Sequence, residues 1–174
     1  MKNAFSALLF VALFIGISIG CKKDDEVNPD AIEGTWNLYE LRGEDGTSTT
    51  TLFGEVFAYE YEFYGEDFDA TTTFTESPNT FESEGTYTAV TITDVNGVID
   101  TTFTPLTAFD EGGTWYIEGN TMHQILLGDT TSFEILELNN DKLRLRYDLD
   151  ITFTDPLTGA NTHDEATVYF SWEK

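Results

Sequence analysis

Apolar and polar residues alternate along most of the chain after residue 33, with the period of two that is typical of half-buried strands. The clearest case is segment 143–153, where Leu, Tyr, Ile and Phe occupy every second position and polar residues lie between them. A second case is segment 57–63, where Phe57, Tyr59, Tyr61 and Phe63 share one face. Patterns with a helical period are nearly absent, so the alternation predicts an all-β domain.

Turn residues divide this pattern into strands of ordinary length. Asn96-Gly97 suits a two-residue hairpin, and Pro105 is expected to end its strand or to place it at a sheet edge. The polar stretch 42–51 is expected to form a long loop, and 42–55 is a candidate lid. Further turns are expected at 77–79, 118–120, 128–129, 139–141 and 156–161.

The strands and turns together predict an antiparallel up-and-down meander of about eight to ten strands. A flat sheet of this size leaves long edges unpaired, and such chains usually close into a barrel or fold into two packed sheets. Because hairpins follow one another without intervening helices, closure into a β-barrel is the expected architecture.

The first 20 residues have a different pattern. Lys2 gives a positive start, residues 4–20 are uncharged and mostly apolar, and Cys21 follows directly. This layout predicts a cleaved secretory signal peptide at 1–20, a tether at 21–32 and one domain at 33–174. A membrane-spanning helix is the main alternative, but 17 uncharged residues are marginal for it. A core helix is less favoured because the run has no polar face.

Gly20-Cys21 resembles the lipobox of bacterial lipoproteins, although Ser18 stands where that family usually has Leu. The resemblance implies that Cys21 is the lipid attachment site, which also accounts for a single cysteine in an exported chain. The residues that follow resemble the export signal of surface lipoproteins in the Bacteroidetes group. They are Lys22, Lys23, Asp24, Asp25 and Glu26. This implies anchoring in the outer membrane, facing the cell exterior, although a solvated charged tether gives the same composition.

The charge of the chain limits its partners. The net charge is −24, and removing residues 1–20 removes one lysine and no acidic residue, which leaves −25. Such a charge disfavours nucleic acid and anionic lipid surfaces as partners. The chain is nevertheless 40% hydrophobic and 14% aromatic, which argues against an unfolded acidic polypeptide. With a single cysteine, no internal disulfide stabilises the fold, so a packed core must do so.

Three segments resemble lipocalin-like (calycin) domains. Gly34-Thr35-Trp36 matches the Gly-x-Trp opening strand, 113–120 resembles a hairpin in the middle of the domain, and 136–146 fits a later hairpin. Two features of the family differ here: its Thr-Asp-Tyr motif has no counterpart, and the last strand lacks the arginine that packs over the tryptophan. Arg144 or Arg146 is a candidate replacement from the preceding strand. The resemblance implies a barrel that holds a small ligand.

Catalytic chemistry is not expected. The chain has two histidines, His123 and His163, and no serine lies in a nucleophile-elbow glycine frame. The histidines are too far apart in sequence to chelate a transition metal locally. Asp94 to Gly97 and the Asp148/Asp150 pair offer oxygen ligands, but neither follows a calcium-loop pattern. No catalytic residue, metal site or cofactor is therefore predicted.

Aromatic residues are the remaining functional lead. Inside a barrel they form either a packed core or the wall of an apolar cavity, and buried tyrosines favour a cavity with some polar lining. The candidate cavity residues are Phe57, Tyr59, Tyr61, Phe63, Trp115 and Tyr147. Two hypotheses follow: an anchored barrel that binds a small hydrophobic or amphipathic ligand, or an accessory envelope lipoprotein with a filled core that acts through its outer surface.

Overall fold

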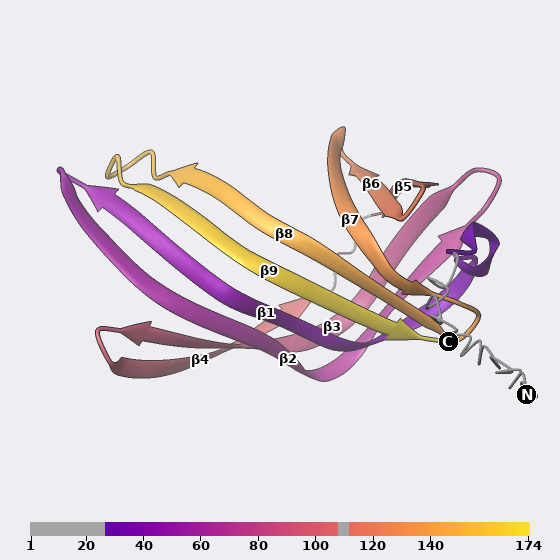
Figure 1. Ribbon diagram of the computed structural model, residues 1–174, viewed down its shortest axis with the longest axis horizontal. Helices are drawn as coiled ribbons and strands as arrows, with labels where there is room; N and C mark the ends of the chain where they lie inside the picture. The colour runs from indigo at the N-terminus through magenta and orange to yellow at the C-terminus, as the bar shows by residue number, and fades with distance from the viewer. Residues whose placement is uncertain (1–26, 108–111) are drawn as a thin grey trace, which may run out of the picture.

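The computed structural model in Figure 1 describes residues 27–107 and 112–174. In these residues a short 3-10 helix, η1 (Pro29–Ala31), precedes nine strands. The strands are β1 (Gly34–Leu52), β2 (Glu55–Thr75), β3 (Thr80–Val95), β4 (Val98–Thr107), β5 (Gly112–Glu118), β6 (Thr121–Leu126), β7 (Asp129–Leu138), β8 (Lys142–Thr154) and β9 (Asn161–Glu173).

Eight of the nine strands form a closed ring of hydrogen-bonded neighbours. The order is β2-β1-β9-β8-β7-β6-β5-β3, and β3 also pairs with β2, which completes the ring. β4 lies outside the ring and pairs with β3. Every pairing is antiparallel, and most neighbours in the sheet are also consecutive in sequence. The predicted all-β antiparallel meander is therefore confirmed.

The ring closes at one end of the molecule only. β7 pairs with β8 from Leu143 to Arg146, whereas β8 continues to Thr154 with β9 as its partner. Similarly, β5 pairs with β3 only at 80–82, and β4 takes the same edge of β3 at 86–95. We call the part that includes the start of β1 and the end of β9 the closed end. The part that carries the β1–β2 and β8–β9 hairpins, at the left of Figure 1, is the open end.

The main core fills the closed end. Trp36, Phe74 and Leu143 have at most 1% of their surface exposed, and the rings of Phe74 and Trp115 meet edge to face with centroids 6.0 Å apart. A smaller cluster of Leu41, Ala166 and Val168 follows toward the open end. Burial then falls along the same strands beyond Arg146, where the pairing of β8 with β7 ends: Phe153 at the tip of β8 is 60% exposed.

A cation from the end of the chain covers the core tryptophan. Lys174 Nζ lies 4.3 Å from the centroid of the Trp36 ring and donates hydrogen bonds to the carbonyl oxygens of Ala31 and Glu33. The expectation that Arg144 or Arg146 takes this place is wrong. Arg146 instead contacts Glu134 and Asp148 on the outer face of the sheet.

The expected loop and candidate lid over 42–55 are also wrong. β1 continues through this segment to Leu52 and pairs with β2 on one side and β9 on the other. Half of the polar residues in 42–51 are threonines, whose branched side chains suit a strand. The register shifts between Gly43 and Gly46, so a bulge absorbs the irregular part of the sequence.

The expected turns and faces are mostly confirmed. Asn96 and Gly97 connect β3 to β4 with φ of 55° and 84°, as a tight two-residue hairpin requires. Pro105 lies in the edge strand β4. On β8, Leu143 and Leu145 are buried while Lys142 and Arg144 face outward, in agreement with the alternation.

Candidate functional site: an internal cavity

A cavity of about 330 Å³ lies inside the ring, between the closed-end core and the open end. Side chains from seven strands (β1 to β3 and β6 to β9) surround it, so the site exists only because the sheet closes. The apolar lining includes Leu38, Leu41, Phe133, Leu145, Phe170 and Trp172. The polar lining consists of neutral groups: Thr71, Thr72, Ser83, Tyr87, Gln124, Thr131 and Tyr147.

The polar groups of the cavity differ in how far they are already paired. The hydroxyls of Thr72 and Ser83 lie 2.9 Å apart and satisfy each other. The ring of Tyr87 stacks on Phe68 with centroids 6.1 Å apart, and burial raises the pKa of Tyr87. Because the tyrosine stays neutral well above neutral pH, it remains a hydrogen-bond donor to a ligand. The cavity therefore offers an apolar surface with a few neutral polar groups.

The residues predicted to line a cavity lie in three places. Tyr147 lines the cavity. Tyr61 and Phe63 pack against the small cluster of Leu41, Ala166 and Val168, with their ring centroids 6.4 Å apart. Phe57 and Tyr59 continue this aromatic row toward the open end and are 58% and 37% exposed.

Trp115 lies instead in the closed-end core. Its Nε1 donates hydrogen bonds to the carbonyl oxygens of Thr75 and Thr80, at 3.2 and 3.1 Å. These bonds join β5 to the β2–β3 turn, which makes Trp115 a structural residue of the ring.

Several lining residues were not predicted from the sequence. Leu38, Tyr87 and Gln124 come from β1, β3 and β6, which approach one another only when the ring closes. Alternation places each of them on one face of its strand, but it does not tell which strands lie across the cavity. The sequence therefore indicates only that these side chains lie on the inward face of their strands.

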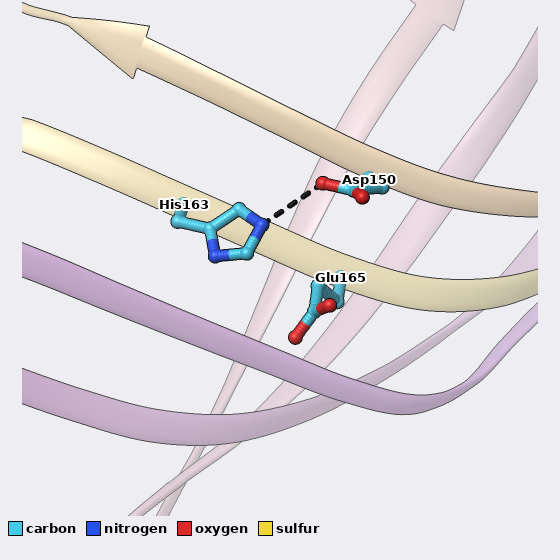
Figure 2. Close-up of side chains that lie close together, drawn as sticks. All are labelled: Asp150, His163 and Glu165. Carbon is cyan, nitrogen blue, oxygen red and sulfur yellow. Dashed lines mark hydrogen bonds and ion pairs between the residues drawn. The ribbon is translucent and has the colours of Figure 1, made fainter.

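A second group of side chains lies on the outer face of the β8–β9 hairpin (Figure 2). His163 Nε2 lies 2.9 Å from Asp150 Oδ1, and ligand atoms of Asp150, His163 and Glu165 all lie within 4.8 Å of one another. The hydrogen bond to Asp150 is the main cause that raises the pKa of His163. His123 lies elsewhere, bonded to Ser132 and stacked on Tyr116 at 4.4 Å.

The predicted anchor and export signal, Cys21 and Lys22 to Glu26, lie outside the described residues. Within 27–107 and 112–174, no helix has the length and apolar character needed to cross a membrane.

Comparison with known proteins gives no relative: no family model, no curated protein and no solved structure matches the chain. Its function must therefore be inferred from its own residues and geometry.

Proposed function

We propose that this protein is an outer-membrane lipoprotein whose lipocalin-like barrel binds a small, uncharged hydrophobic or amphipathic ligand. The observation that carries the proposal is the cavity, which lies within the ring and is lined by apolar side chains with a few neutral polar groups. Ligand sites in proteins combine these two kinds of lining, since apolar surface supplies affinity and a few polar groups fix orientation.

The cavity limits the ligand in size and charge. About 330 Å³ is near the lower end of the 300–1,000 Å³ range typical of small-molecule sites. No charged side chain lines the cavity among the described residues, so an ionised ligand loses its hydration there without a partner. Tyr87, Gln124 and Thr131 are the groups that orient a ligand bearing a hydroxyl, carbonyl or amide.

The contact between Lys174 and Trp36 supports the lipocalin-like assignment. Lipocalins pack an arginine from the last strand over the tryptophan of the Gly-x-Trp motif. Here Lys174, which directly follows β9, lies over Trp36 and keeps a cation at an equivalent place. The closed ring of eight antiparallel strands agrees with the same assignment.

The anchor is tested separately from the cavity. Replacing Cys21 by Ser should deplete the protein from the membrane fraction and abolish incorporation of labelled fatty acid. Protease treatment of intact cells should degrade the domain if it faces the exterior. A domain that survives this treatment in intact cells and is degraded after lysis lies inside the envelope, which contradicts the surface assignment.

Binding is tested with the neutral fluorescent probe N-phenyl-1-naphthylamine and the chain from residue 22 onward, purified without lipid. Thr131 faces the cavity, whereas Thr130, its neighbour on β7, is exposed and lies on the other face. We expect Thr131→Trp to weaken binding at least tenfold and Thr130→Trp to leave it unchanged, with circular dichroism confirming both folds. The proposal fails if the unsubstituted protein takes up no probe, or if the two variants bind alike.

A second candidate is an accessory envelope protein that acts through its outer surface. The exposed aromatic residues of the open end, Phe57, Phe103 and Phe153, favour it because each has more than half of its surface accessible. Repeated recovery of the same envelope proteins from detergent-solubilised membranes supports this candidate, and recovery alone counts against it.

A further inference from the structure

We propose that Asp150, His163 and Glu165 form a binding site for a divalent transition-metal ion of the Zn²⁺ class. The fold brings these residues together at the open end of the sheet. Asp150 on β8 is directly opposite Glu165 on β9, and His163 lies two residues before Glu165, on the same face. Figure 2 shows His163 bonded to Asp150 on the neighbouring strand, with Glu165 beside His163 on its own strand.

The donor set selects the kind of ion. One imidazole nitrogen and two carboxylate oxygens are a combination that Zn²⁺ and its neighbours in the first transition row accept, whereas Ca²⁺ and Mg²⁺ prefer oxygen ligands alone. His163 and Glu165 are close in the sequence, but Asp150 lies 13 positions before His163 and meets it only through the pairing of β8 with β9.

The spacing of the donors fits a single ion. Ligands bound at about 2.1 Å lie at most about 4.2 Å apart across the ion. The donor atoms here already lie within 4.8 Å of one another, so small rotations of the side chains bring them into range. Asp150 and Glu165 are exposed and His163 is only partly buried, so neither core packing nor the backbone opposes such rotations.

The two carboxylates also need a cation. Like charges directly opposite each other on antiparallel strands are destabilising. The nearest arginine along this face of β8, Arg146, is engaged by Glu134 and Asp148 at 2.9 and 2.8 Å. Among the described residues, the imidazole of His163 is the one basic group within ion-pair distance of Asp150, and none reaches Glu165. A bound divalent ion removes this repulsion.

The site is separate from the cavity. Leu149 and Ile151, which flank Asp150, occupy the opposite face of β8, and Leu149 packs against the inner cluster of Leu41, Ala166 and Val168. The metal site therefore lies on the outside of the sheet, with coordination positions open to water. Metal binding and binding of a hydrophobic ligand can fail or succeed independently.

Calorimetric titration with Zn²⁺ alone tests the proposal. The full chain is used in detergent, with Cys21→Ser in every sample so that no thiol competes for the metal. We expect one ion per chain and no displacement by an equal concentration of Ca²⁺. His163→Gln, Asp150→Asn and Glu165→Gln should each weaken binding by more than the 10- to 100-fold that the loss of an outer-shell partner costs.

Two matched variants and one direct signal complete the test. His123→Gln removes the other histidine, and Asp148→Asn removes a neighbouring carboxylate that Arg146 already binds, so both should bind Zn²⁺ as the parent does. Because the chain has two histidines, the imidazole ¹⁵N resonances identify the ligand: those of His163 should shift on saturation and those of His123 should not. The proposal is overturned if the parent binds no Zn²⁺, if His163→Gln binds equally well, or if only His123 responds.

Discussion

The ammonium group of Lys174 lies 4.3 Å from the centroid of the Trp36 ring, and the same nitrogen donates to the carbonyl oxygens of Ala31 and Glu33 at 2.9 and 2.8 Å. Trp36 Nε1 in turn donates to the carbonyl oxygen of Ile32 at 2.7 Å. One side chain therefore joins the last residue after β9 to η1 and to the first strand. These contacts of Lys174 therefore contribute to the free energy of unfolding of the closed end.

Removing the Lys174 amine should destabilise the fold. Lys174→Ala loses one cation–π contact and two hydrogen bonds at a partly exposed site, so we expect a loss of about 1 kcal/mol. Lys174→Arg keeps a cation over the ring and should lose less. Lys142→Ala serves as a control for charge alone. Urea unfolding measures all three, and equal losses for Lys174→Ala and Lys142→Ala would contradict the assigned contacts.

The two ends of the sheet should differ in their contribution to stability. Phe74 is 1% exposed in the closed-end core, and Phe153 is 60% exposed at the tip of β8. We expect Phe74→Ala to cost about 3–5 kcal/mol. The same change at Phe153 should cost less than about 1 kcal/mol. Thermal and urea unfolding of the pair check this, and a Phe153 variant as unstable as the Phe74 variant would show that the open end is packed in solution.

Gly85 should be irreplaceable. It has φ of 103° opposite the bulge of β2, and a Cβ atom there would lie 1.9 Å from the carbonyl oxygen of Asp69. Gly85→Ala must therefore move the backbone, and we expect a loss above about 3 kcal/mol or failure to fold. Gly97 also has positive φ but faces open space, so Gly97→Ala should cost only about 1–2 kcal/mol. Soluble yield and urea midpoints distinguish the two outcomes.

Burial of Tyr87 should make the fold sensitive to alkali. Burial raises the pKa of Tyr87 in the folded state above its value of 10.0 in the unfolded chain. Its contribution to stability is therefore fully present below pH 10 and is lost as pH rises through the folded pKa. We expect the urea midpoint to fall as the pH rises above 10, and to fall less in Tyr87→Phe. An identical fall in both proteins would mean that other groups cause it.

The sequence predicted the class of fold and the inward faces of most strands, because alternation depends only on burial. It predicted less about which strands pair with or pack against one another. Leu145 and Phe153 occupy the same face of β8, yet only Leu145 is buried, because β7 leaves β8 after Arg146. Polarity also misled the interpretation of 42–51, where threonines that pair on both sides form a strand instead of a loop.

The candidate sites required the fold for the same reason. Tyr147 was predicted, but Tyr87 and Gln124 join it only through closure of the ring. Likewise, nothing in the spacing of Asp150 and His163 indicates that the β8–β9 pairing places them 2.9 Å apart. Sequence patterns report the environment of each strand, whereas sites in this fold depend on contacts between strands.

The closed end is also the part of the fold nearest to the proposed anchor. Val27, the first described residue, packs against the closed-end core. If Cys21 carries the lipid, five residues separate it from Val27, and five residues span at most about 18 Å. The closed end would then lie next to the lipid headgroups. The β1–β2 and β8–β9 hairpins and the Asp150–His163–Glu165 group would lie at the far end of the domain, away from the bilayer. If the anchored domain also faces the exterior as proposed, ligands and ions would reach the two proposed sites from the surrounding water, without passage through the lipid.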